Sequence, residues 1–100
     1  MANWRSQAFL RLAKGQPCYL RLVRCSGTDT VVPAHSNMLR HGRGFGFKSH
    51  DLYTVPACHN CHAELDSGAK LSKEDKQDAF LRAWEQWMLH LVRNGHLVVQ

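Results

Sequence analysis

The sequence predicts a small α+β domain that is stabilised by a bound metal ion and flanked by an N-terminal and a C-terminal helix. Three observations support this fold class: the chain has 100 residues, it contains four cysteines, and two of its segments repeat apolar residues at helical spacing. A chain of this size forms only a marginal hydrophobic core, so such domains often add a metal ion or disulfides. Its 44% hydrophobic and 21% charged residues are ordinary for a globular protein. We therefore expect one domain over residues 1–100.

The N-terminal segment is predicted to be a short basic helix. Asn3 is a suitable N-cap, and Gly15 and Pro17 end the apolar pattern. The residues expected on its apolar face are Trp4, Ala8, Phe9 and Leu12.

Residues 17–66 are expected to form the core motif. The stretch "CYLRLVRC" alternates like a strand, "SGTD" is typical of a turn, and "TDTVVPAH" is a second extended piece. We expect these pieces to pair as a hairpin that brings Cys18 and Cys25 together. The stretch "LYTVPAC" predicts a further short strand that leads into Cys58, and Cys61 to Asp66 can form a helical turn.

A C-terminal helix is predicted over residues 73–94. Ser72 and Asp75 match a capping box, and Gly95 is a good stop. Core packing against the first helix is the favoured interpretation of its apolar stripe, and a partner-binding face is the alternative. The stripe consists of Phe80, Ala83, Trp84, Trp87, Met88, Leu91 and Val92.

The four cysteines predict one structural zinc site. Cys58 and Cys61 are separated by two residues, which lets both sulfurs face one ion from a tight turn. Cys18 and Cys25 have six residues between them, so they need the hairpin to come together. Four thiolates complete the coordination of zinc and leave no position for water. Buried free cysteines without a metal are the alternative interpretation.

Charge and glycine content indicate a nucleic-acid partner. The formal net charge of +5 favours an anionic ligand without requiring one. The stretch "NMLRHGRGFGFKSHD" has three glycines, and its Arg40, Arg43 and Lys48 are predicted to contact DNA phosphates. A merely flexible loop is the alternative. Because no apolar run reaches about 20 residues and the N-terminus lacks a signal-peptide pattern, we expect a cytoplasmic protein with no membrane contact.

Three further side chains predict reaction chemistry that zinc does not explain. His62 and Asp66 are four residues apart, so on a helix they share a face where an imidazole and a carboxylate can hold a catalytic divalent ion such as Mg²⁺ or Mn²⁺. His35 ends an extended segment that the fold can lay against this helix. An imidazole titrates near neutrality, which suits a general base.

The stretches "AHSN", "HGRGFGFKSHD" and "ACHNCHAELD" resemble the HNH, or ββα-metal, endonuclease superfamily, most nearly the short nuclease-like proteins of lambdoid prophages. The resemblance covers residues 17–66 closely and the C-terminal helix more loosely. It implies a ββα-metal fold that binds the DNA minor groove and cleaves DNA in a bacterial host cell. It also implies that His35 is the general base, that His62 is a ligand of the catalytic ion, and that Asp51 takes the middle position of the motif.

The chain departs from this family at two positions. Ala34 stands where many members carry an acidic or histidine metal ligand, so Asp66 or Asp51 is expected to replace that ligand. The middle residue is an aspartate rather than an asparagine.

The favoured function is a metal-dependent DNA endonuclease. The alternative is a non-catalytic, zinc-stabilised DNA-binding or adaptor module, which would have no use for His35, His62 and Asp66. Both a monomer and a dimer are compatible with the sequence.

Overall fold

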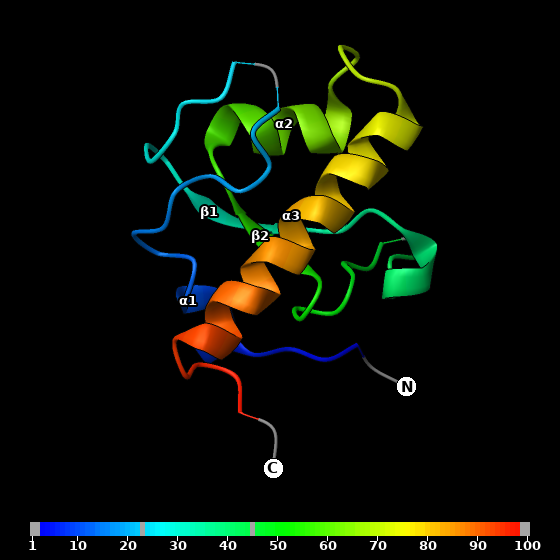
Figure 1. The fold of residues 1–100 in the computed structure, drawn as a ribbon. Helices are drawn as coiled ribbons and strands as arrows, with labels where there is room; N and C mark the ends of the chain where they lie inside the picture. Colours follow the sequence, from blue (N-terminus) through cyan, green and yellow to red (C-terminus); the bar gives the residue numbers. More distant parts are fainter. Residues whose placement is uncertain (1–2, 23, 45, 99–100) are drawn as a thin grey trace.

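The structure, a computed structural model, describes residues 3–22, 24–44 and 46–98. It confirms the α+β class. The described elements, in chain order, are α1 (Gln7–Arg11), β1 (Val32–His35), the 3-10 helix η1 (Leu39–His41), β2 (Thr54–Ala57), α2 (His59–Ser67) and α3 (Lys73–Arg93). Figure 1 shows the long helix α3 crossing the two strands, with α2 near the start of α3 and α1 near its end.

The two strands form an antiparallel sheet in which Val32 pairs with Ala57 and His35 with Thr54. All four residues of β2 are buried. The strand leads directly into α2, because Cys58 follows it and caps the helix. The chain therefore runs strand, strand, helix, and His35 lies at the carboxyl end of the first strand.

The predicted hairpin between residues 18–25 and 28–35 is wrong, because β1 pairs with β2 instead. The described residues of the first segment, 18–22 and 24–25, curl rather than extend. Arg21 and Arg24 have φ values of 50° and 57°, which belong to the left-handed region and interrupt a strand. The curled segment is attached to the sheet by a 2.8 Å hydrogen bond from the Tyr19 amide to the Pro56 carbonyl.

The first helix is shorter than predicted, and its N-cap is Ser6 rather than Asn3. The Ser6 hydroxyl accepts a hydrogen bond from the Phe9 amide at 3.1 Å. Asn3 instead donates its side-chain amide to the carbonyls of Gly42 and Lys48, at 2.7 and 2.8 Å. The N-terminal segment is thereby tied to the loop between the strands.

The last helix agrees with the prediction. The Ser72 hydroxyl accepts from the Asp75 amide at 3.0 Å, and the helix ends before Gly95, whose φ of 75° suits glycine. Phe80 packs in the core beside the sheet, while Trp87 packs against Phe9 of α1. Val92, which was predicted to belong to the buried stripe, is instead 51% exposed.

Candidate metal centre and histidine site

The four cysteines gather at one point, as predicted, although the predicted hairpin does not form. Cys58 is the N-cap of α2, Cys61 lies in its first turn, and Cys18 and Cys25 come from the curled segment. Their four sulfur atoms all lie within 4.8 Å of one another. Within the described ranges, they are the only group of three or more His, Cys, Asp or Glu side chains close enough to hold a metal ion.

The geometry of these thiols fits a structural metal such as zinc. In a tetrahedral site with Zn–S bonds of about 2.3 Å, the sulfurs lie about 3.8 Å apart. The sulfurs of Cys25 and Cys58 are 4.0 Å apart, and all four cysteines are free thiols rather than disulfides. Backbone amides also point at the sulfurs: Leu22 donates to Cys61 at 3.2 Å and Ser26 to Cys58 at 3.4 Å. Such donors stabilise the thiolate form that binds metal.

The two cysteines of α2 differ in acidity before any ion binds. Burial raises the pKa of Cys58, but hydrogen bonds from Ser26 and the Cys61 amide outweigh it and bring the value to about 6. Burial raises the pKa of Cys61 well above its usual range. At neutral pH Cys58 is therefore largely a thiolate while Cys61 keeps its proton, so a metal that binds both must displace the Cys61 proton, which couples its binding to pH.

A second, more open pair of side chains lies on the exposed side of α2. His62 Nε2 is 3.0 Å from Asp66 Oδ2, and the two side chains are 35% and 48% exposed. The Asn37 amide, two residues beyond β1, donates to Asp66 Oδ1 at 3.1 Å and to the Leu65 carbonyl at 3.2 Å. The expected pairing of His62 with Asp66 is thus present, and Asn37 joins it to the end of the first strand.

The electrostatics of this pair follow from its hydrogen bonds. The bond to Asp66 raises the pKa of His62 against the opposing effect of burial. Burial raises the pKa of Asp66, but the bonds from His62 and Asn37 outweigh it and leave the pKa below its usual value. The carboxylate is therefore ionised at neutral pH, and its partner imidazole can exchange a proton for a metal ion.

We expected Asp51 to join His62 and Asp66 as a ligand of one divalent ion, but the structure does not place these three side chains together. Asp51 is 3% exposed, and its Oδ1 is 2.8 Å from His35 Nε2 and 3.1 Å from an Arg5 nitrogen. Its Oδ2 accepts the Ser6 amide at 2.7 Å. Both carboxylate oxygens are occupied by protein donors, which explains why Asp51 is unsuited to hold a metal ion beside α2.

This environment determines the state of His35. Burial raises the pKa of Asp51, but the hydrogen bonds from His35 and Ser6 outweigh it and lower the pKa overall. Burial lowers the pKa of His35 by more than Asp51 raises it. At neutral pH an ionised carboxylate therefore faces a neutral imidazole. Because a carboxylate only accepts, Nε2 carries the hydrogen and Nδ1 keeps its lone pair.

Lys48 connects the two histidine environments. Its charge lowers the pKa of His35 and opposes the rise in the pKa of His62. It also lines a pocket of about 370 Å³ together with His35 and Asp51. Of the other predicted DNA contacts, Arg43 and Arg40 are exposed, and Arg43 lowers the pKa of Asp66.

Two other loop histidines have structural roles. His41 is buried, lies 2.6 Å from the Ser36 hydroxyl through Nδ1, and stacks on Tyr53 with ring centres 4.1 Å apart. His50 accepts the Trp4 amide at 2.8 Å. These contacts distinguish them from His35 and His62, each of which pairs with a carboxylate.

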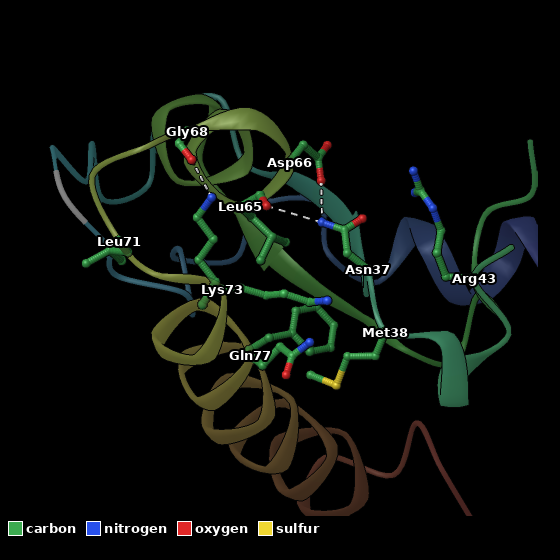
Figure 2. Close-up of a pocket in the computed structure, with 11 residues that line it drawn as sticks. Asn37, Met38, Arg43, Leu65, Asp66, Gly68, Leu71, Lys73 and Gln77 are labelled. Atoms are coloured by element: carbon green, nitrogen blue, oxygen red, sulfur yellow. Dashed lines mark hydrogen bonds between the residues drawn. The ribbon is translucent and has the colours of Figure 1, made fainter. Parts of the chain in front are cut away.

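Sequence reasoning missed several residues of this region. Leu39 and Phe47 are 79% and 68% exposed in the loop between the strands. Asn37 and residues of α3 line a pocket of about 520 Å³ that borders Asp66 (Figure 2). Asn37 lies within the "AHSN" stretch of the predicted motif. The contribution of α3 was not predicted, because core packing was the favoured interpretation of that helix.

The fold and the site define a class of protein: a small α+β domain in which a four-cysteine centre anchors a strand–strand–helix unit. The chain belongs to the family described as "Protein of unknown function (DUF968)", whose model matches residues 1–88. It is 35% identical over 75 residues to YdfU, an uncharacterized protein of Escherichia coli (strain K12). The match covers 74% of this chain and 19% of YdfU, so the chain spans about a fifth of that relative.

The fold also resembles a solved structure, described as that of "a putative bacteriophage protein from Escherichia coli str. K-12 substr. MG1655". The TM-score is 0.67 at 22% identity, over 87% of this chain and 99% of the other. At this identity the likeness concerns the fold alone. In the part of the chain that the structure describes, no helix has both the length and the apolar character needed to cross a membrane.

Proposed function

We propose that this protein is a metal-dependent endonuclease that hydrolyses phosphodiester bonds in DNA. The observation that carries the proposal is the orientation of His35 by Asp51 at the end of β1, which Asn37, two residues further along the chain, links to the open His62–Asp66 pair on α2. The strand–strand–helix order and the positions of both histidines agree with the HNH arrangement that the sequence resembles. The description of the similar solved structure supports a bacteriophage origin, and with it action inside a bacterial cell.

In this proposal His35 is the general base. Its Nδ1 takes a proton from water, whose oxygen attacks phosphorus while the bond to the leaving oxygen breaks. Asp51 holds the imidazole through Nε2 and stabilises the positive charge that the ring acquires. The leaving oxygen takes its proton from solvent water. His62 and Asp66 would hold a divalent ion, which supplies charge neutralisation at the phosphate and the leaving group.

The cysteine centre has a supporting role in this mechanism. Cys61 is fully buried and directly precedes His62, so a zinc bound there fixes the start of α2 and the position of the second ligand set. Four thiolates leave zinc no open position, so the chemistry belongs to the histidine side.

Contacts to DNA are assigned to the loop between the strands. Arg40, Arg43 and Lys48 are exposed there and would bind phosphates. Leu39 and Phe47 are exposed beside them, and apolar side chains of this kind insert into the minor groove in other proteins.

A non-catalytic DNA-binding module is the second candidate. It is favoured by Ala34, which is fully buried at the position where the resemblance expects another metal ligand. The His62–Asp66 pair then offers only two side-chain ligands.

Nicking of supercoiled plasmid tests the proposal. Zinc-loaded protein is assayed with Mg²⁺ or Mn²⁺, and His35→Ala is compared with His96→Ala, which removes an exposed histidine after α3. Loss of the base should slow cleavage by about 10²–10⁴-fold, whereas the control should match the wild type. A wild type that binds DNA and never nicks it would favour the binding module.

A further inference from the structure

A pocket of about 520 Å³ lies between α2, α3 and the segment after β1, and we call it the α2–α3 pocket. Its volume is within the range of small-ligand sites. Figure 2 shows Lys73 extending across it from the first turn of α3, with Gln77 one turn further along and Asp66 and Arg43 near its rim. The remaining lining residues are Asn37, Met38, Leu65, Gly68, Leu71, Lys76 and Phe80.

The lining combines an apolar floor with cationic walls. Met38, Leu65 and Phe80 line the floor with the small parts of their side chains that stay exposed (6%, 6% and 1%), and the amides of Asn37 and Gln77 can pair with polar edges. Among the charged lining residues, Arg43 and Lys73 lie with Asp66, whereas the ammonium of Lys76 is engaged by the Gly68 carbonyl and by Glu64, 3.9 Å away. This combination suits a ligand with a flat, partly apolar ring and an attached anionic group.

The wall formed by residues 68–72 is held in place without a ligand. Glu64 is 7% exposed, and its Oε2 accepts the amides of Lys70 and Leu71, each at 3.0 Å. The chain approaches so closely that a Cβ on Gly68 would lie 2.1 Å from Glu64 Oε1. Lys76 closes the same corner by donating to the Gly68 carbonyl. A preformed pocket avoids the ordering cost of binding.

The position of the pocket connects it to the reaction. Asp66 borders the pocket and also binds His62, so an occupant would lie beside the proposed catalytic ion. A base inside a duplex is stacked and paired, so it cannot contact the apolar lining of the α2–α3 pocket. An unpaired base can leave the stack at a cost of only a few kcal/mol or less.

We propose that the α2–α3 pocket binds one unpaired nucleotide of the DNA strand, with its base on the apolar floor and its phosphate on Arg43 and Lys73. The proposal rests on the endonuclease function above and names its substrate class: DNA with an unpaired nucleotide next to the cleaved bond.

The test is equilibrium binding of zinc-loaded protein to two 25-base-pair duplexes, without Mg²⁺ or Mn²⁺. One duplex is fully paired, and the other carries one extra, unpaired 2-aminopurine at its centre. Because contacts to an unpaired base add to the affinity of the backbone contacts, we expect the bulged duplex to bind about tenfold more tightly. The emission of 2-aminopurine should rise on binding, because the base leaves the stack that quenches it.

Gln77→Trp should fill the pocket and remove the preference, and Gln86→Trp, on the exposed side of the same helix, should keep it. Lys73→Glu gives a second variant that leaves the core untouched, with Arg82→Glu as its control. Melting curves verify that each variant folds. In the divalent-ion assay, cuts should fall beside the unpaired nucleotide.

The outcomes separate the two proposals. A preference for the bulged duplex without any cleavage would reject the endonuclease and keep the pocket assignment. Cleavage with equal affinity for both duplexes would reject the pocket assignment and keep the endonuclease. Equal affinities of Gln77→Trp and wild type for the bulged duplex, or no binding of either duplex, would also overturn the pocket assignment.

Discussion

The two faces of α2 carry two ligand sets that differ in burial and in completeness. On one face, Cys61 is fully buried and belongs to a closed group of four thiols. On the other, His62 and Asp66 are 35% and 48% exposed and form a pair with room for further ligands. Ligands withdrawn from water suit a structural metal, whereas ligands open to water remain accessible from outside. Under the proposed function, one short helix would combine a folding role with a reactive one.

Removing a buried ligand should produce the largest effect. Cys58→Ser leaves three thiolates for zinc, and structural zinc contributes about 10–16 kcal/mol of binding free energy in zinc-finger peptides. We expect the variant to lose zinc and to unfold at room temperature, as measured by circular dichroism and metal content. His62→Ala is the matched control on the exposed face, and it should keep both zinc and fold. Unchanged melting of the wild type in excess chelator would contradict the role of the metal.

Asp51→Asn should affect the rate without removing either ligand set. An amide can donate to Nε2 and thereby favour the tautomer with hydrogen on Nδ1, which disables the base. Cleavage should fall by up to about 10²–10⁴-fold, mainly in kcat, with zinc retained.

Arg5→Ala is the control for this substitution. It removes another partner of Asp51, at 3.1 Å, and leaves the bond to His35 in place. If Arg5→Ala and Asp51→Asn slow cleavage equally, Asp51 acts by anchoring the N-terminal segment and not by orienting His35.

The loop cations should have a moderate, salt-dependent effect on binding. Changing Arg40, Arg43 and Lys48 together to Ala should reduce the slope of log K against log salt by about 0.9 for each lost phosphate contact, or up to about 2.7. The measurement is fluorescence anisotropy with duplex DNA over a range of salt concentrations. A variant that replaces the exposed Lys14, Arg82 and Arg93 serves as the control. Equal slopes for the two triple variants would show that the DNA does not contact the loop between the strands.

The smallest effect concerns stability against pH. The pKa of His35 is lowered by burial, so the unfolded chain takes up this proton first as the pH falls below about 6.5. Stability should therefore decline between that value and the lower pKa of the folded state. The Asp51 contribution persists until the pH falls through its own lowered pKa. His35→Ala should flatten the profile between pH 7.5 and 5.5, as measured by thermal melting, and an unchanged slope would contradict this assignment.

The sequence predicted the local chemistry better than the strand pairing. The Cys58–Cys61 spacing, the His62–Asp66 spacing and the Ser72 cap are local patterns, and all three are present in the structure. The pairing of β1 with β2 depends on contacts across a loop of 18 residues, from Ser36 to Tyr53, and on the left-handed backbone of Arg21. Neither the contacts across this loop nor the left-handed conformation of Arg21 can be recognised from the residue types along the chain.

The same limit applies to single side chains. Asp51 was expected beside α2, because a carboxylate in a motif suggests a metal ligand. Its actual partners are His35 and, 46 and 45 residues away in sequence, Arg5 and Ser6. Long-range partners of this kind decide whether a carboxylate binds metal or orients a base.

The proposal that α2 carries two separate metal sites is tested most directly by metal stoichiometry. Zinc-loaded protein is titrated with Mn²⁺, which is followed by its electron paramagnetic resonance signal, and zinc is measured in parallel. We expect one retained zinc and one exchangeable Mn²⁺ for each wild-type chain. His62→Ala should keep the zinc and lose the Mn²⁺, while His96→Ala should bind both. If His62→Ala binds Mn²⁺ as tightly as the wild type, or if it loses its zinc, the two faces of α2 do not carry separate metal sites.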